Sequence, residues 1–137
     1  MAEISGISHI QLTVSSMARS RPFYERLLHA LGMVTLIARD DFYYCIGGRT
    51  GVAISPAGPG ALPFDQRVVG LHHLCFRART RADVDAIHRT AQELGARIVR
   101  APAETDWAPG YYSVLFEDPD GIRIEANHVP GRGHLEP

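Results

Sequence analysis

Two histidines in repeated segments are the first candidates for chemistry in this chain. His9 is the fourth residue of the segment 6–14, and His73 is the fourth residue of the segment 70–78, 64 positions later. Each segment opens with glycine and continues with alternating apolar and polar residues, a pattern typical of a strand with one buried face. The repeat therefore predicts two equivalent strands that present the two histidines at matching places.

Glu125 is the third candidate, because strand periodicity places it on one face with Arg123 in a predicted strand over residues 122–127. If that face is concave, Glu125 joins His9 and His73. Two histidines and one carboxylate that leave other positions open are typical of Fe(II) sites and compatible with Mn, Ni, Co or Zn. A glutamate between apolar neighbours is also typical of the wet face of a strand, so spacing alone leaves both interpretations open.

The same periodicity assigns the neighbours of these candidates. Gln11 shares the face of the first histidine and Cys75 that of the second, although a buried structural thiol is the commoner case for such a cysteine. His72 is expected to face away from the histidine that follows it, and His128 is expected to be exposed at the end of its strand. Neither is predicted to bind metal.

The elements that must position these residues repeat as well. Each half of the chain is predicted to form one strand, one helix and three further strands. We therefore expect an α+β fold of two βαβββ modules in a curved mixed sheet, with the helices outside. The later strands are predicted at about residues 33–39, 41–46 and 51–55, and at about 96–100, 111–117 and 122–127. We expect a single domain with module 1 at about 4–56, a linker at about 57–69, module 2 at about 70–128 and a short tail at 129–137.

Helix signals are clear in the second half and ambiguous in the first. Thr80 and Asp83 have the spacing of a capping box at the start of the second helix. In the first half, Pro22 allows two interpretations. It fits the first turn of a helix capped by Ser20, or it kinks a helix that starts near Ser16.

Composition limits the classes of function. Of 137 residues, 45% are hydrophobic, and the formal net charge is −1 with basic residues scattered singly. These values are ordinary for a soluble globular protein and predict neither nucleic acid nor an acidic membrane as a partner. Lysine is absent, which excludes Schiff-base chemistry and a phosphate-loop lysine. Two cysteines far apart in sequence, no basic and apolar leader and no apolar run of membrane length predict a reduced, cytoplasmic protein.

The motifs at residues 9–14, 20–24, 31–33, 70–74 and 116–125 cover nearly the whole chain, and together they resemble the vicinal oxygen chelate superfamily. This superfamily includes glyoxalase I, extradiol dioxygenases, fosfomycin-modifying thiol transferases, methylmalonyl-CoA epimerases and bleomycin-binding proteins. The resemblance implies that His9, His73 and Glu125 are the ligands of one divalent metal ion.

The resemblance also implies a substrate and a reaction. A small molecule with two neighbouring oxygens would occupy the open positions of the metal, which would act as a Lewis acid in chemistry of the lyase or isomerase kind. Glu125 and Tyr111 are the candidates to move protons. The alternatives are a dioxygenase and a drug- or metabolite-binding resistance protein without turnover. The superfamily further suggests a homodimer.

The residues around the predicted metal fit no branch of the superfamily completely. Glyoxalase I has a fourth, carboxylate ligand, whereas we expect Ser55 at the place equivalent to Glu125, which argues against a strict glyoxalase I. Extradiol dioxygenases have an acid–base Tyr and His, and here Leu115 takes the place of the Tyr. Trp107 is predicted either to close the substrate site as a lid or to pack against the protein. The residues expected to line that site are Gln11, Tyr43, Ser55, Cys75, Trp107, Ser113 and Arg123, together with Tyr111.

Overall fold

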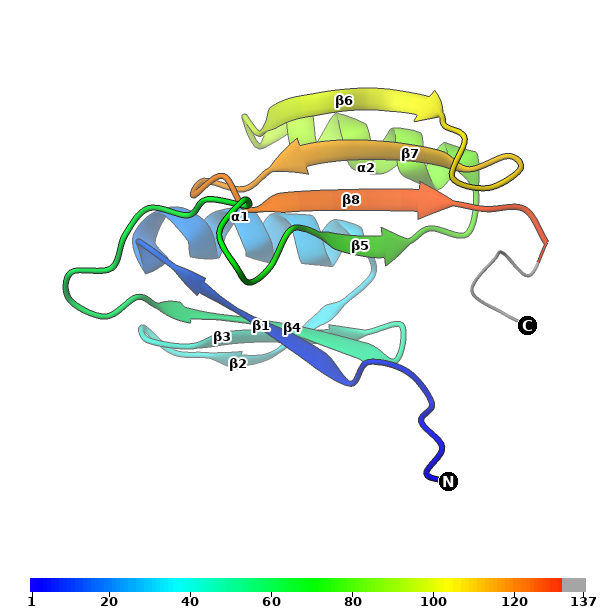
Figure 1. The fold of residues 1–137 in the computed structure, drawn as a ribbon. Helices are drawn as coiled ribbons and strands as arrows, with labels where there is room; N and C mark the ends of the chain where they lie inside the picture. The colour runs from blue at the N-terminus through cyan, green and yellow to red at the C-terminus, as the bar shows by residue number, and fades with distance from the viewer. Residues whose placement is uncertain (132–137) are drawn as a thin grey trace. The chain divides into compact units, whose positions relative to one another are not determined.

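The computed structural model describes residues 1–131 and divides the chain into two compact units (Figure 1). Unit 1 covers Met1–Pro63 and unit 2 covers Phe64–Pro137. The division falls within the linker predicted at about 57–69. The predicted tail at 129–137 lies mostly outside the described residues.

Unit 1 is one βαβββ module whose four strands form a single mixed sheet. Its strand order is β1-β4-β3-β2, in which β1 and β4 are parallel and the other neighbours are antiparallel. The elements are β1 (His9–Val14), α1 (Met17–Ala30), β2 (Val34–Ala38), β3 (Tyr43–Gly47) and β4 (Thr50–Pro56).

The start of α1 decides between the two interpretations of Pro22. Ser16 is the N-cap, and its side-chain oxygen accepts a hydrogen bond from the backbone N–H of Arg19 at 3.3 Å. Pro22 therefore lies inside the helix, so the helix that starts near Ser16 is the correct alternative and the cap at Ser20 is wrong. The apolar face of the helix, which includes Phe23, Tyr24, Leu27 and Leu28, is buried.

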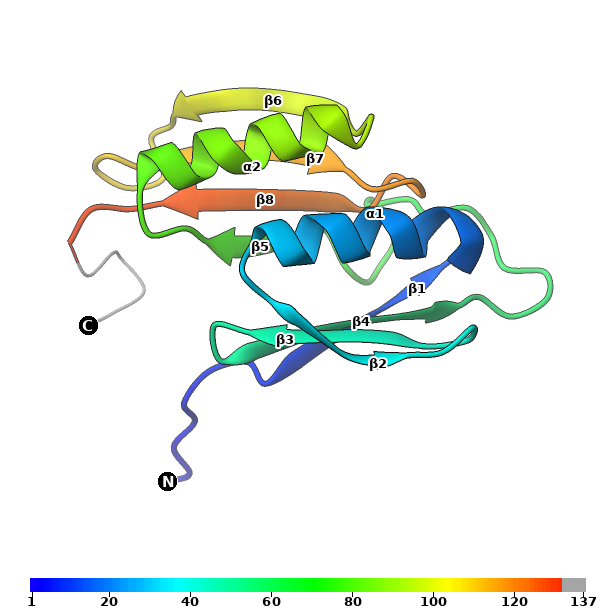
Figure 2. The same cartoon turned by 180° about the vertical axis from the view of Figure 1, so that it is seen from behind.

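Unit 2 repeats the module. Its strand order is β5-β8-β7-β6, again with one parallel pair, β5 and β8, and two antiparallel pairs. The helix α2 lies along the strands β6, β7 and β8 (Figure 2). The elements are β5 (Leu74–Arg77), α2 (Arg81–Glu93), β6 (Arg97–Glu104), β7 (Tyr112–Glu117) and β8 (Arg123–His128).

The predicted capping box of α2 is confirmed. The Thr80 side chain accepts from the backbone N–H of Asp83 at 3.1 Å, and the Asp83 carboxylate accepts from the backbone N–H of Thr80 at 2.9 Å. Val84, Ile87 and Ala91 are buried on one face of this helix, as its apolar periodicity predicts. The cap and the apolar face together fix where α2 begins and which side of it meets the sheet.

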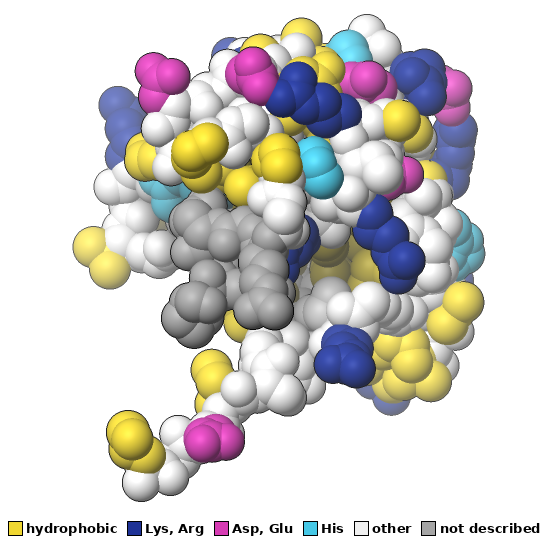
Figure 3. All heavy atoms as spheres, turned by 90° about the vertical axis from the view of Figure 1, so that its right-hand side faces the viewer, with side chains coloured by type: hydrophobic (Ala, Val, Ile, Leu, Met, Phe, Trp, Pro, Cys, Tyr) yellow, Lys and Arg dark blue, Asp and Glu magenta, His cyan; other side chains and the backbone are white. Residues whose placement is uncertain are grey.

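The predicted α+β fold of two βαβββ modules is confirmed, with the strands hydrogen-bonded as two four-stranded sheets. In residues 1–131, no helix combines the length and the apolar character that crossing a membrane requires. On the face shown in Figure 3, the basic side chains stand in separate groups rather than in one continuous patch.

Candidate functional site

The candidate site is centred on Glu125 in the middle of β8. Glu125 is 8% exposed, and each of its carboxylate oxygens has a different neighbour. Oε2 lies 3.1 Å from Nε2 of His73, while Oε1 accepts a hydrogen bond from the Tyr111 hydroxyl at 2.7 Å. Nη2 of Arg100 lies 3.8 Å from Oε1. A buried carboxylate is thus held between an imidazole, a phenol and a guanidinium.

The strand register explains why these side chains meet. Glu125 lies opposite Leu115 of β7 on one side and Cys75 of β5 on the other, and directly paired residues share a face of the sheet. Ser113 is two residues before Leu115, and Tyr111 two residues before that, so both are on the face of Glu125. The structure therefore brings together Tyr111, Ser113, Cys75 and Glu125, which the sequence pattern placed on one face.

Arg100 is a member of the site that the sequence pattern did not reveal. Its guanidinium donates to the backbone oxygen of Ser113 at 3.1 Å and to the Ser113 hydroxyl at 2.8 Å. The register of β6 shifts between Ile98 and Arg100 and again before Ala103. Such irregularities break the alternation of faces, so counting by two along this strand could not have placed Arg100.

Burial changes the acidity of the phenol and the thiol beside Glu125. Burial raises the pKa of Tyr111, and the hydrogen bond to Glu125 raises it further. The phenol therefore stays protonated at neutral pH and acts as a donor. Part of the surface of Cys75 is exposed, but its sulfur is surrounded by protein. This burial, and to a smaller extent the negative charge of Glu125, raises the pKa of the thiol to about 12. Cys75 is thus a poor nucleophile at neutral pH.

In unit 1, His9 begins β1 as an exposed residue. Its ring lies edge-on to that of Tyr44, with 6.4 Å between the ring centroids. On the same face of the sheet, the Gln11 side-chain amide donates to the Ser55 hydroxyl at 3.0 Å. Unit 1 therefore presents one imidazole, one amide and one hydroxyl on this face.

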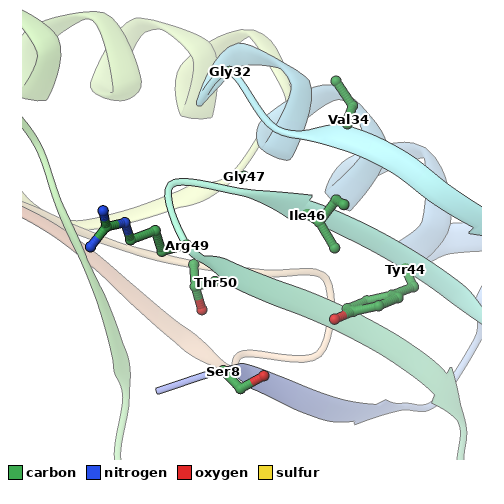
Figure 4. A pocket seen from close by; sticks show the side chains of 8 residues that line it. All are labelled: Ser8, Gly32, Val34, Tyr44, Ile46, Gly47, Arg49 and Thr50. Carbon is green, nitrogen blue, oxygen red and sulfur yellow. The ribbon is translucent and has the colours of Figure 1, made fainter. Parts of the chain in front are cut away.

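A pocket of about 490 Å³ lies beside this face of unit 1 (Figure 4). It is walled by the side chains of β2 and β3 and by the hairpin that joins β3 to β4. Most of the side chains that line it are apolar or uncharged, and Arg49 contributes the one charged group among them. The lining residues are Ser8, Gly32, Val34, Tyr44, Ile46, Gly47, Arg49 and Thr50.

The prediction that Tyr43 lines the substrate site is wrong. Tyr43 and Cys45 are both fully buried, and the Tyr43 hydroxyl lies 3.0 Å from the Cys45 sulfur and 2.8 Å from the Thr35 hydroxyl. Tyr44 pairs with Ala53, which pairs with Gln11, so Tyr44 is the residue on the face of His9. The matching place in β3 is therefore one residue later than predicted.

The lengths of two turns explain this error. Gly47 pairs with Thr50, so two residues join β3 to β4, whereas Glu117 pairs with Arg123, so five residues join β7 to β8. The short turn is possible because Gly48 and Arg49 both have positive φ, as a two-residue hairpin of this kind requires. The two turns therefore differ by three residues. Because this number is odd and side chains alternate between faces, counting back from β4 by the spacing of module 2 assigns the residues of β3 to the wrong face.

The place equivalent to Glu125 is Ala53, and the prediction of Ser55 is wrong. Cys75 pairs with Glu125, and its repeat mate Gln11 pairs with Ala53. Ser55 lies two residues further along the same face. Ala53 cannot bind a metal, so the conclusion that module 1 supplies no carboxylate ligand at this place is unchanged.

The expectation that His72 faces away from His73 is also wrong. β5 begins only at Leu74, so alternation does not govern the two histidines before it. Their Nδ1 atoms lie 2.8 Å apart, and Nε2 of His72 lies 3.0 Å from the Gln66 side-chain nitrogen. His72 is therefore a direct neighbour of the predicted ligand.

Two further predicted site residues, Arg123 and Trp107, are not among the polar neighbours of Glu125 in the described part of the chain. Arg123 is on the face of Glu125, but its Nε is directed toward Glu117 at 3.6 Å. Trp107, between β6 and β7, is 79% exposed and therefore does not pack against the protein. A lid role for Trp107 stays a prediction.

Two atoms of unit 2 have a spacing that adjacent ligands of a divalent metal can have, as well as partners in a hydrogen bond. The 3.1 Å between His73 Nε2 and Glu125 Oε2 matches two adjacent ligands, because bonds of about 2.0–2.2 Å at a right angle separate their donor atoms by about 3 Å. Tyr111 holds the other carboxylate oxygen, as outer contacts do for ligating carboxylates. Within residues 1–131, no three His, Cys, Asp or Glu side chains form a group that could hold a metal. Because His9 belongs to unit 1, its part in the triad stays a prediction.

The sequence matches the Glyoxalase/Bleomycin resistance protein/Dioxygenase superfamily over residues 6–126. The chain belongs to this superfamily. It is also similar to protein YqjT of Bacillus subtilis (strain 168), with 29% identity over 126 residues that cover 85% of this chain and 94% of YqjT.

Crystal structures of superfamily members have the same fold as this chain. A structure from Bacillus halodurans matches with a TM-score of 0.78 and 24% identity over 91% of this chain and 96% of its own. Lactoylglutathione lyase from Agrobacterium tumefaciens matches with a TM-score of 0.67 and 19% identity, covering 93% and 96%. The fosfomycin resistance protein FosX from Mesorhizobium loti matches with 0.66 and 22%, covering 93% and 94%. The same fold thus supports more than one chemistry, and the site must decide between them.

Proposed function

We propose that this chain is a metal-dependent, glyoxalase-like enzyme that binds a small molecule through two neighbouring oxygens. The observation that carries the proposal is that the two carboxylate oxygens of Glu125 have different partners. One oxygen faces His73 Nε2 at 3.1 Å, and the other is held by the Tyr111 hydroxyl at 2.7 Å. His9 is the proposed third ligand, and the ion is one of Fe, Mn, Ni, Co or Zn. Membership of the superfamily supports this assignment.

Each residue of unit 2 has a separate task in this proposal. A bound divalent ion supplies Lewis acidity toward the oxygens of the substrate. Glu125 and His73 hold the ion through the two donor atoms that face each other. Tyr111 fixes the orientation of the carboxylate and, because its pKa is raised, keeps its proton at neutral pH and acts as a hydrogen-bond donor. Arg100, fixed by Ser113, offers positive charge to a substrate oxyanion.

The side chains around these groups would contact the rest of the substrate. In unit 1, Tyr44 replaces Tyr43 in this role, because it lies on the face of His9 and lines the pocket. The other residues that we propose for substrate contact are Gln11, Ser55, Cys75, Trp107, Ser113 and Arg123.

We favour chemistry of the lyase or isomerase kind over a dioxygenase reaction. Leu115 lies directly opposite Glu125, so the place at which the resemblance puts an acid–base tyrosine in extradiol dioxygenases holds an apolar side chain. We propose that Glu125 and water move protons at this site, with the Tyr111 hydroxyl as a hydrogen-bond donor. Such groups suit the stabilisation and protonation of an oxyanion.

Metal binding tests the proposal directly. The purified chain would be stripped with a chelator, loaded in turn with Zn²⁺, Mn²⁺, Ni²⁺, Co²⁺ and, without oxygen, Fe²⁺, and analysed for bound metal. We expect one ion per chain in the wild type and loss of tight binding in His9→Ala, His73→Ala and Glu125→Ala. His128→Ala is the matched control, because position 128 is on the opposite face of β8 from Glu125. Equal metal content in the wild type and the Glu125 variant would refute the proposal.

The alternative function is a drug- or metabolite-binding protein without turnover. It predicts a chain that binds small molecules but no metal, so metal content followed by a screen of metabolites with the reconstituted protein distinguishes the two. We further propose a homodimer in the cytoplasm. Light scattering during size-exclusion chromatography would test the dimer, because it measures the mass of the assembly against 15.1 kDa per chain.

A further inference from the structure

Four side chains of unit 2 form a continuous chain of close polar contacts that ends at the proposed metal ligands. Gln66 Nε2 lies 3.0 Å from His72 Nε2, His72 Nδ1 lies 2.8 Å from His73 Nδ1, and His73 Nε2 lies 3.1 Å from Glu125 Oε2. Each of the two imidazoles uses both of its nitrogens in these contacts. Gln66 and His72 have no part in the proposed function so far.

The backbone before β5 makes these contacts possible. Residues 71–73 are not in a strand, so two successive histidine side chains can approach each other. Gly70, with φ of 147°, adopts a conformation that other residues rarely reach, and the chain turns here toward β5. The two imidazole rings then meet edge-on, at 75° and with 5.0 Å between centroids.

A neutral imidazole carries one proton, so its two nitrogens are one donor and one acceptor. This rule allows only two arrangements of the protons along these contacts. In the first, the Gln66 amide donates to His72 Nε2, His72 Nδ1–H donates to His73 Nδ1, and His73 Nε2–H donates to Glu125. In the second, the Gln66 amide oxygen accepts from His72 Nε2–H, and His73 Nδ1–H donates to His72.

The two arrangements differ in what they leave for a metal. Only the second frees the lone pair of His73 Nε2, the atom that faces Glu125. Both hold the same number of protons, so the change needs no uptake or release of a proton. It needs only a turn of the Gln66 amide and a shift of one proton within each ring, with exchange through water.

We propose that Gln66 and His72 are positioning residues that set which nitrogen of His73 carries its proton, and so present Nε2 to the metal. The inference rests on the proposed role of His73 as a ligand. Partners of this kind fix the tautomer and ring orientation of ligating histidines, and their loss lowers metal affinity by about 10–100-fold. In this chain the partner would be a second histidine, itself fixed by an amide.

We call the contacts from Gln66 through His72 and His73 to Glu125 the relay, and Zn²⁺ affinity in four variants tests it. His72→Phe keeps a ring but removes both nitrogens, and we expect its dissociation constant for Zn²⁺ to rise by about 10-fold or more. His72→Asn should recover part of this loss, because its amide oxygen can accept from His73 Nδ1–H. Gln66→Glu can only accept from His72, so it enforces the second arrangement and should bind Zn²⁺ more tightly than the wild type. His88→Phe, on α2, is the control and should bind like the wild type.

The double variant Gln66→Glu with His72→Phe separates the relay from simple charge attraction. If the new carboxylate acts through His72, it gives no gain in the absence of His72, whereas a charge effect would persist. Tighter binding by Gln66→Glu that survives in the double variant would overturn the proposal. So would wild-type affinity in His72→Phe.

Nitrogen-15 NMR of the histidine rings tests the relay without any metal. In the metal-free chain, we expect the proton of His73 on Nε2 and that of His72 on Nδ1, and we expect Gln66→Glu to reverse both. A chain that binds no Zn²⁺ but shows this reversal would refute the proposed function while supporting the relay. Unchanged tautomers in Gln66→Glu would refute the relay, whatever the metal result.

Discussion

The hydroxyl of Tyr111 offers the sharpest single-atom test of the site. Tyr111→Phe removes the hydrogen bond of 2.7 Å to Glu125 Oε1 and leaves the ring in place. Tyr111 is 7% exposed and Glu125 is 8% exposed, so water has little access to take over the lost bond. The other neighbour of Oε1, the Arg100 guanidinium, is 3.8 Å away, beyond a good hydrogen bond.

The expected effect follows from the charge and burial of the acceptor. A hydrogen bond to a charged group contributes about 1.5–3 kcal/mol, and a buried acceptor left without a donor costs a similar amount. We therefore expect the free energy of unfolding of the metal-free protein to fall by about 1.5–3 kcal/mol. Since 1.4 kcal/mol is a factor of ten, the same loss of carboxylate orientation should weaken metal binding by about 10–100-fold.

Urea unfolding and Zn²⁺ competition against a chromogenic chelator measure the two effects. Tyr112→Phe is the matched control, because its hydroxyl donates to Asp85 of α2 at 2.8 Å, on the opposite side of the sheet. This control should lose stability but keep its metal affinity. Wild-type Zn²⁺ affinity in Tyr111→Phe, or an equal loss of affinity in Tyr112→Phe, would show that Tyr111 does not orient a metal ligand.

Four further predictions concern the cap of α2, the thiol of Cys75, the place equivalent to Glu125 in module 1, and turnover. Thr80→Ala should lower the free energy of unfolding by about 0.5–2 kcal/mol in urea titrations because it removes the cap of α2, and Thr80→Ser should not. The pKa of Cys75, about 12, keeps its thiol protonated at neutral pH, so iodoacetamide should label it slowly at pH 8 and faster as the pH rises. Glu125→Gln removes a charge that raises this pKa and should speed the labelling, as mass spectrometry of the Cys75 peptide would measure. Ala53→Glu should bind metal more tightly than the wild type and than Ser55→Glu, because position 53 is the equivalent of Glu125. The native chain, which has no carboxylate at this place, should show low or no turnover of the hemithioacetal of methylglyoxal and glutathione. Efficient turnover would contradict this expectation, because it would mean that one carboxylate suffices.

The sequence was sufficient for the fold because its signals are local and repeated. The capping box at Thr80 and the apolar periodicities were enough to predict two βαβββ modules. The face of Glu125 was also predictable, since β8 and β7 alternate without interruption around it and Tyr111 follows from the same count. Within a regular strand, counting by two is reliable.

The errors lie where regular alternation stops. Tyr43 was placed on the wrong face because the turns of the two modules differ in length by an odd number of residues. His72 was misjudged because β5 begins later than the repeat indicated, and Arg100 was missed because β6 changes register. Each depends on a hydrogen-bond register that residue types do not reveal.

The corrected register makes the two modules chemically unequal. At the place where module 2 has Glu125, module 1 has Ala53, and where module 2 has Cys75, module 1 has Gln11. The repeated backbones thus carry different side chains: unit 2 has a buried carboxylate with a polar neighbour at each oxygen, whereas the pocket of unit 1 is lined mostly by uncharged residues. An isomerase that moves a proton between two carbons gains from basic groups on both sides of its substrate, and of the two equivalent places only that of Glu125 holds a carboxylate. Under the proposed function, the carboxylate that can move a proton therefore comes from module 2 alone, which favours a reaction that forms and protonates an oxyanion over one that needs two opposed bases.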